Sequence, residues 1–242
     1  MLTNMDKTIR AAIILSTVFI STLPATFAQT QSKTSSQLQT KAAPKSNVST
    51  PPQKKVTAAQ IAAAKTLGTK SAPIQFEVFS DFQCPACKSF FLSASHRLVE
   101  DYCSAGKVYL VHHDFPMTTI PSHVHSEEAA RWANAAAAIG KFHEVESALY
   151  THQESWEVTG KIDEVLADVL SPADLKRVRA LVDDAEVKAA LQHDRDLGNA
   201  NNVETRGTPS IFVTHNGHRE LLPPSGVSYN LLKPYLDYLL QH

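Results

Sequence analysis

The chain has 242 residues, 43% of them hydrophobic, so it is long and apolar enough to bury a core without covalent cross-links. Its three cysteines are too few for a disulfide scaffold, and their odd number leaves one over. The net charge is −1, but residues 29–56 carry five lysines and no acid, so the rest of the chain is acidic. An acidic body argues against a nucleic-acid partner, because phosphate binding needs clustered cations.

The first 28 residues have the pattern of an export signal. A positively charged start precedes an apolar run over residues 11–23, which is followed by Pro24 and by small residues that allow cleavage after Ala28. The run is shorter than the roughly 20 apolar residues that a membrane span needs. We therefore predict a signal peptide over residues 1–28 and a periplasmic or secreted protein. An uncleaved N-terminal segment that tethers the protein to the membrane is the alternative.

Residues 29–56 are predicted to be a disordered basic linker. The segment consists mainly of Gln, Ser, Thr, Lys, Ala and Pro, and it cannot bury enough apolar surface to offset the entropy cost of ordering. Order is expected to begin at Thr57, where the pattern Thr57-Ala58-Ala59-Gln60 predicts a capping box. The short alanine-rich helix that it opens is expected to end before Gly68.

A strand, a helix and a second strand are predicted next. Residues 74–79 form a β-rich run after a proline, and residues 88–102 carry apolar side chains at helical spacing up to a stop at Gly106. The second strand is expected over residues 108–113. Because a crossover of this length joins parallel strands, we expect the two strands to be parallel.

The middle of the chain is predicted to be helical. Apolar residues recur at helical spacing between residues 129 and 137, and Ser126 is expected to cap that helix at its N-terminus. Ser171 followed by Pro172 predicts another helix start, since proline fits the first helical position. Further helices are expected at residues 141–150, 161–170 and 184–199.

Two strands and a helix are predicted near the C-terminus. The strands are expected at residues 210–214 and 218–222, and the Asn216-Gly217 pair between them predicts an antiparallel two-residue hairpin. An amphipathic helix over residues 231–239 is expected to lie on the sheet.

These elements together predict an α/β fold class, with a mixed β-sheet flanked by helices. We assign residues 57–117 and 203–242 to the sheet-forming domain. Residues 118–202 are assigned to a helical insertion, because they carry apolar faces of their own.

The Cys84-Pro85-Ala86-Cys87 motif stands where the first long strand meets a helix. A thiolate at a helix N-terminus is stabilised by unpaired N–H groups and the helix dipole, and its pKa can fall from about 8.5 to between about 3.5 and 7.5. Pro85 suits the first helical position. We predict that Cys84 is the exposed, attacking thiolate and that the more covered Cys87 resolves the mixed disulfide.

Two other interpretations of the motif are open. Two cysteines supply only half of a closed zinc site, and His112, His113 and Cys103 do not have the spacing of a known ligand pair. A structural disulfide in so short a loop would restrict the unfolded chain very little. Cys103 is expected to be a buried, inert residue, with a functional thiol as the alternative.

No metal or cofactor is predicted. The sequence lacks a glycine-rich phosphate loop, a serine nucleophile elbow and a paired-carboxylate arrangement. Its eleven histidines are scattered, and His123 and His125 are expected at the surface.

Three segments of the chain together resemble the DsbA-like thioredoxin-fold thiol–disulfide oxidoreductases. Residues 72–87 are similar to the active-site strand and helix of that family, and residues 111–117 to the strand that ends in Asp/Asn-Phe-Pro. Residues 206–210 are similar to the cis-proline loop before its third strand. The resemblance covers roughly residues 66–241 and implies a thioredoxin fold with a helical insertion.

The resemblance also implies roles for individual residues. Pro209 would have a cis peptide bond to Thr208, and this loop would lie beside Cys84 and bind an extended substrate segment. A buried acid on the first strand assists proton transfer in the family, and Glu77 is the candidate here, one position away from its place in the best-studied members. A glutamate exposed at a strand edge is the alternative for Glu77, and Asp81 is a second candidate charge near the thiols.

The implied function is disulfide exchange with exported proteins that carry free cysteines, most simply as an oxidase recycled by a membrane redox partner. Pro85-Ala86 lacks the histidine found in strongly oxidising members, so we predict a less extreme potential. A reductase or isomerase of the same fold, and a non-catalytic peptide-binding module with a structural disulfide, are the alternatives. The substrates, the recycling partner and the oligomeric state are left open.

Overall fold

The computed structural model describes residues 55–224 and 227–242 of the chain. The predicted signal peptide and nearly all of the predicted linker lie outside these residues. Within the described part, no helix is both long and apolar enough to cross a membrane.

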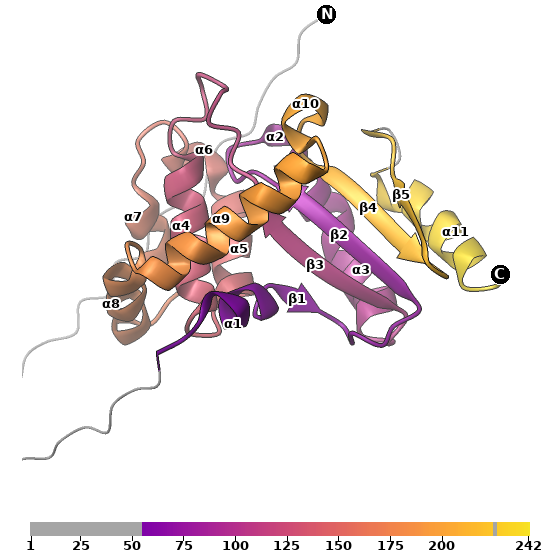
Figure 1. The fold of residues 1–242 in the computed structure, drawn as a ribbon. Helices are drawn as coiled ribbons and strands as arrows, with labels where there is room; N and C mark the ends of the chain where they lie inside the picture. The colour runs from indigo at the N-terminus through magenta and orange to yellow at the C-terminus, as the bar shows by residue number, and fades with distance from the viewer. Residues whose placement is uncertain (1–54, 225–226) are drawn as a thin grey trace, which may run out of the picture. The chain divides into compact units, whose positions relative to one another are not determined.

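Five strands form one mixed sheet with helices around it (Figure 1). The strands are β1 (Thr66–Leu67), β2 (Ile74–Ser80), β3 (Val108–Asp114), β4 (Ser210–His215) and β5 (His218–Leu221). The helical segments are α1 (Ala58–Ala63), α2 (Pro85–Phe90), the π-helical η1 (Phe91–Ser95), α3 (His96–Leu98), the π-helical η2 (Val99–Cys103), α4 (Ser126–Ala137), α5 (Phe142–Thr151), α6 (Gln153–Trp156), α7 (Ile162–Ala167), α8 (Pro172–Leu181), α9 (Ala185–Ala200), α10 (Val203–Arg206) and α11 (Tyr229–Leu239). The predicted fold class, a mixed sheet flanked by helices, is confirmed.

The strand order is β1-β3-β2-β4-β5, which puts β2 in the centre of the sheet. β2 and β3 are parallel, as the length of the crossover predicts, and β4 pairs antiparallel with β2. β4 and β5 form the predicted hairpin, in which Asn216 and Gly217 have φ values of 49° and 77°. Both residues therefore adopt the left-handed conformation that a tight hairpin turn of this kind requires.

One strand was not predicted. The capping box of Thr57 and Gln60 is present, but α1 ends at Ala63 and the chain then forms β1, antiparallel to β3. Gly68 follows β1 with φ +85°, and a Cβ built there would lie 2.2 Å from the carbonyl oxygen of Val108. The strand ends where only glycine allows this close approach.

The two faces of the sheet are covered by different helices. Alternate residues of β2, beginning with Ile74, pack with α2, α3 and α11 in one apolar cluster. On the opposite face Phe79 packs with Phe115, Phe212 and the start of α10. α9 contacts β3 and runs from α8 to α10 beside the sheet (Figure 1).

The helices between β3 and β4 form a third apolar cluster, which is shared with the cysteine motif. Cys84, Cys87 and Phe82 pack in this cluster with residues of α4, α5, α7, α8 and α9. The motif therefore lies where the sheet domain meets the segment that was assigned to an insertion. The boundaries of that assignment, 118–202 for the insertion, stay a prediction.

Candidate active site

The cysteine motif opens the helix that follows β2, as predicted. Cys84 is the N-cap of α2, with φ −77° and ψ 120°, and Pro85 occupies the first helical position. The N–H of Cys87 donates a hydrogen bond to the Cys84 sulfur at 3.4 Å. The motif thus places one sulfur over the unpaired N–H groups at the end of the helix.

A segment far along the chain meets the same sulfur. The Cys84 thiol donates a hydrogen bond to the carbonyl oxygen of Thr208 at 3.2 Å, and the Thr208–Pro209 peptide bond is cis. The predicted cis bond and the predicted position of this loop beside Cys84 are both confirmed.

The two thiols have opposite electrostatic environments. The hydrogen bond from the Cys87 thiol, together with those from the Thr208 side chain and the backbone N–H groups of Cys87 and Ala86, lowers the pKa of Cys84 from 9.0 to about 6 against the effect of burial. Burial, and then the neighbouring Cys84 sulfur, raises the pKa of Cys87 well above its ordinary value. Near neutral pH the pair therefore holds one thiolate, on Cys84.

The prediction that Cys84 is exposed is wrong. Its exposed fraction is 7%, against 1% for Cys87, so the order is as predicted but both side chains are buried. The carbonyl of Thr208 and the helical cluster next to the motif cover the Cys84 sulfur. Cys103 is buried as predicted, and burial raises its pKa to about 11.

Glu77 lies on the face of the sheet away from the thiols. Its neighbour Val78 lines a small cavity next to Cys87, and successive strand residues point to opposite faces. The Glu77 carboxylate accepts a hydrogen bond from Arg219 at 2.9 Å and lies 3.6 Å from His113. Against the effect of burial, His113 and Arg219 lower its pKa. β2 is a central strand, so the alternative of an exposed edge glutamate is wrong, and the proton-transfer role stays a prediction.

Asp81 fixes the loops around the motif. Its buried carboxylate accepts hydrogen bonds from the backbone N–H groups of Gln83 and Met117, both at 2.8 Å. His123 Nδ1 lies 2.8 Å from the same carboxylate, and the Ser126 hydroxyl donates to it.

Two sequence predictions about these partners of Asp81 are wrong. His123 is buried rather than at the surface, because it pairs with Asp81. Ser126 does not cap α4, whose N-cap is His125 without a side-chain hydrogen bond. The Ser126 hydroxyl instead donates its hydrogen bond to Asp81.

Gln83, next to Cys84, holds two loops of the helical segment and was not predicted to matter. Its amide nitrogen donates to the carbonyl oxygens of Ser122, at 3.3 Å, and Glu157, at 2.7 Å. Its amide oxygen accepts from the N–H of His125 at 2.6 Å. The side chain therefore sets the positions of two loops that flank the first cysteine.

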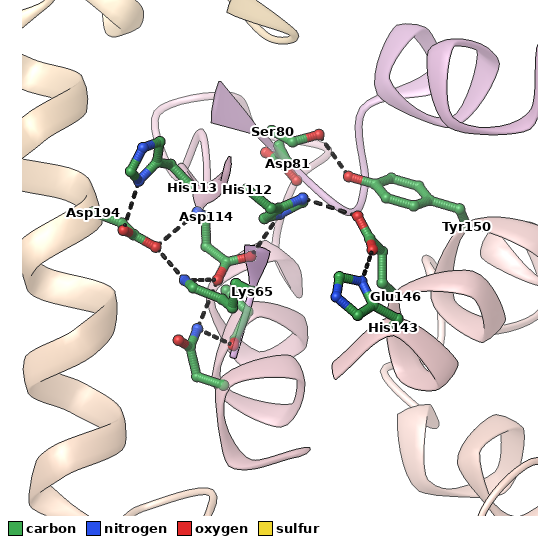
Figure 2. A network of polar contacts seen from close by, with 12 residues as sticks. Lys65, Ser80, Asp81, His112, His113, Asp114, His143, Glu146, Tyr150 and Asp194 are labelled. Atoms are coloured by element: carbon green, nitrogen blue, oxygen red, sulfur yellow. Dashed lines mark hydrogen bonds and ion pairs between the residues drawn. The ribbon is translucent and has the colours of Figure 1, made fainter. Parts of the chain in front are cut away.

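A buried network of charged residues lies behind the motif (Figure 2). Lys65 pairs with Asp114, at 2.7 Å, and with Asp194. His112 lies 3.1 Å from Asp114 through Nε2 and 2.9 Å from Glu146 through Nδ1. These residues come from the β1 side, from the end of β3, from α5 and from α9, and the sequence did not indicate that they meet.

The charges of this network support one another. Burial opposes the charged form of His112, but Glu146 and Asp114 outweigh it and raise its pKa to about 9. Burial likewise opposes the charge of Glu146, but His112 and His143 lower its pKa to about 2. Lys65, whose pKa is raised, and Asp114, whose pKa is lowered, are charged for the same reason. In the described residues, no group of three or more potential metal ligands is placed to hold an ion.

Comparisons with known proteins agree with this geometry. A family model described as Thioredoxin matches residues 61–230. The chain is 26% identical over 161 residues to the probable disulfide bond formation protein D of Bacillus anthracis, covering 63% of this chain and 70% of that protein.

Solved structures give the same result for the fold. BdbD from Bacillus subtilis is similar with a TM-score of 0.60 at 19% identity, covering 74% of this chain and 93% of that one. Wolbachia pipientis alpha-DsbA1 is similar with a TM-score of 0.56 at 18% identity, covering 72% and 89%. The predicted thioredoxin fold is thereby confirmed.

Proposed function

The chain belongs to the thioredoxin family and is a DsbA-like thiol–disulfide oxidoreductase, and on that premise we propose that it oxidises the thiols of exported proteins through Cys84 and Cys87. The observation that carries the proposal is the asymmetry of the two sulfurs. Cys84 has a pKa lowered to about 6 and contacts the cis-proline loop, whereas Cys87 is buried with a raised pKa. A stabilised thiolate is a good leaving group and favours the reduced form of the enzyme, which drives oxidation of the substrate.

The reaction proceeds by two thiol–disulfide exchanges, and Cys84 takes part in both. A substrate thiolate attacks Cys84 of the disulfide, the bond between Cys84 and Cys87 breaks, and Cys87 leaves with the electron pair. A second substrate thiolate then attacks the substrate sulfur of the mixed disulfide, and Cys84 leaves as the stabilised thiolate. The substrate loses two electrons and two protons and gains a disulfide, and the enzyme is left as a dithiol.

Thr208 and Pro209 form the substrate-binding loop in this proposal. The backbone of Thr208 lies within hydrogen-bond distance of the Cys84 sulfur, at the point where β4 begins. An extended substrate segment that pairs with this backbone would hold its own cysteine close to Cys84.

The place of action is part of the proposal. The apolar run over residues 11–23 and the site after Ala28 support export by a cleaved signal peptide, and the basic linker would separate that signal from the enzyme. Export would bring the enzyme together with newly translocated proteins. A membrane redox partner would then reoxidise Cys84 and Cys87.

Two measurements test the proposal. Equilibrating the Cys84–Cys87 pair with glutathione should give a potential between about −120 mV, typical of DsbA, and about −270 mV, typical of thioredoxin. The reason is that a pKa of about 6 for Cys84 lies between the values of about 3.5 and about 7 that those two proteins have. A potential below about −300 mV would identify a structural disulfide and reject the proposal.

A trapping experiment assigns the roles of the two cysteines. Cys87→Ser should accumulate a mixed disulfide between Cys84 and a two-cysteine substrate peptide supplied in its disulfide form, because the Cys84 thiolate opens the peptide disulfide and the resolving thiol is missing. Cys84→Ser should accumulate none, since Cys87 is inaccessible. Trapping through Cys87 would contradict the assignment.

The reductase or isomerase alternative differs in direction only. The value of about 6 for Cys84 is less extreme than that of a strong oxidant, which is the observation in favour of this alternative. If the potential lies near −270 mV and the reduced enzyme cleaves substrate disulfides faster than the oxidised enzyme forms them, the alternative replaces the oxidase.

A further inference from the structure

Cys87 has a proton requirement that its surroundings must meet. When the disulfide is opened at Cys84, Cys87 leaves as a thiolate, yet its side chain is only 1% exposed and burial raises its pKa. A buried thiolate next to a second sulfur is costly unless a proton arrives. Glu77, the sheet acid that sequence reasoning suggested, points to the other face.

A cavity of about 10 Å³ lies directly against Cys87, between the ends of β2 and β3 and helix α5. This is the volume in which one water molecule fits. Part of its wall is apolar and offers no proton donor, as at Val78 and Leu110. The polar part of the wall consists of Ser80, Ser95, His112, Glu146 and Tyr150.

The polar groups around the cavity form two hydrogen-bonded pairs (Figure 2). The hydroxyls of Ser80 and Tyr150 lie 2.6 Å apart, and the Ser80 side chain is near enough to the Cys87 thiol to oppose the rise of its pKa. On the other side, His112 Nδ1 lies 2.9 Å from Glu146. Two hydroxyls and a titratable ion pair thus share one small cavity with Cys87.

The ion pair is also connected to solvent. The second oxygen of Glu146 lies 3.2 Å from His143 Nδ1, and the His143 side chain is 34% exposed. A chain of polar groups therefore leads from the protein surface through His143, Glu146 and His112 to the cavity beside Cys87.

We propose that Ser80, Tyr150 and the His112–Glu146 pair form the proton route of the buried cysteine Cys87, built from the ends of β2 and β3 and from α5 instead of from Glu77. The inference rests on the disulfide exchange proposed above. As the bond between the two sulfurs breaks, His112 passes a proton to the Glu146 carboxylate that its Nδ1 faces, and the proton crosses the cavity and its hydroxyls to the Cys87 thiolate. His112 then regains a proton from solvent through Glu146 and His143. In reoxidation the proton follows the same route outward before Cys87 attacks.

The charges around the cavity suit His112 as the acid. Glu146 on α5 and Asp114 on β3 face its ring, and Lys65 is bound to Asp114 on the far side. Asp81, at the end of β2, is committed to the loops that it holds. The two carboxylates keep His112 protonated at neutral pH, and the imidazolium also stabilises the Cys87 thiolate until the proton arrives.

The test is the pH profile of disulfide opening in the full chain. Reduction of the Cys84–Cys87 disulfide by dithiothreitol is followed by stopped flow between about pH 6 and 10, and each rate is divided by the concentration of dithiothreitol thiolate. The wild type should lose rate per thiolate as pH rises through about 9, where His112 gives up its proton. The Glu146→Gln variant should lose rate per thiolate at a lower pH, nearer 6.5, which is the ordinary pKa of histidine.

Two further variants and one control complete the experiment. Tyr150→Phe, which keeps the ring, and Ser80→Ala should each slow opening at neutral pH by roughly tenfold or more, since positioned proton transfer contributes about that much or more. The matched control is Glu144→Gln on the same helix, half-exposed and paired with Lys141, which should match the wild type.

The outcomes are separable. Alkylation of reduced Cys84 by iodoacetamide should keep its midpoint near pH 6 in every variant that folds, because the route serves Cys87 alone. If Glu146→Gln, Tyr150→Phe and Ser80→Ala all keep the rate and pH profile of Glu144→Gln, the proton route is rejected while the exchange stands. If the wild-type disulfide does not exchange at all, the proposed function fails, and this inference fails with it.

Discussion

On one face of β3, the two halves of the strand are equally buried but chemically opposite. Val108 and Leu110, in the first half, pack into the apolar cluster under α2, α3 and α11. His112 and Asp114, in the second half, are just as inaccessible and carry charge. The first half needs only apolar neighbours, whereas the second half requires a partner for each charge.

This contrast explains how the helical segment is attached to the sheet. Asp114 accepts a hydrogen bond from Asn134 on α4, and its backbone N–H donates to Asp194 on α9. His112 reaches Glu146 on α5. Apolar contacts would tolerate some sliding of the helices, but these directional pairs hold them in one register over the end of the strand.

The largest loss of stability should come from removing Lys65, the cation that pairs with the charged half of β3. Lys65→Met leaves Asp114 and Asp194 buried without their counter-ion and should lower the free energy of unfolding by about 3–5 kcal/mol. Urea denaturation followed by circular dichroism measures the change. The control Lys161→Met, at an exposed pair with Glu164, should leave the urea midpoint unchanged. A Lys65→Met variant as stable as the wild type would mean that the buried charges need no partner.

A second test separates the two halves by pH. His112 has a raised pKa, so the stability it contributes is complete below 6.5 and is lost as pH rises through about 9. Glu146 has a lowered pKa, so its contribution is complete above 4.5 and is lost as pH falls towards about 2. The free energy of unfolding should therefore be highest between about pH 4.5 and 6.5. It should fall by about 3 kcal/mol from about pH 6 to 10.

The apolar half supplies the control for this pH series. Leu110→Ala should lower the unfolding free energy by about 2–4 kcal/mol and leave the shape of its pH dependence unaltered. Glu146→Gln should flatten the alkaline fall instead. Parallel curves for these two variants would contradict the division of β3 into an apolar and an electrostatic half.

The smallest loss of stability is expected from a substitution of Glu77. Glu77→Gln weakens a partly exposed pair with Arg219 and should lower the unfolding free energy by less than about 1 kcal/mol. Because Glu77 faces away from the thiols, the rate at which dithiothreitol opens the disulfide should stay within about twofold of the wild type. A large loss of rate in this variant would restore Glu77 as the proton-transfer acid.

The sequence was most informative where a function depends on local order in the chain. Cys84 and Cys87 are three residues apart and open a helix, so their geometry follows from helix-capping rules. The turn at Asn216 and Gly217 is likewise fixed by the conformations that these two residues accept. The cis bond at Pro209 was predicted through resemblance, since proline alone seldom indicates it.

The charged half of β3 could not be predicted in the same way. Lys65 meets Asp114 and Asp194 across 49 and 129 residues, and nothing in the sequence near Lys65 distinguishes it from a surface lysine. One signal was available. The strand over residues 108–113 runs directly into an acid after two histidines, and a strand in the middle of a sheet can bury these residues only with partners from elsewhere.

The shared cluster that contains Phe82, Cys84 and Cys87 has a consequence for how such enzymes can be recombined. A chimera that takes the helices from a relative and keeps the motif loop from this chain would join two surfaces that were never fitted to each other. Gln83, which binds loops on both sides of the motif, would lose its partners as well. The modular unit for exchange is therefore the helical segment together with residues 80–87, so the catalytic loop is inherited with the helices that cover it.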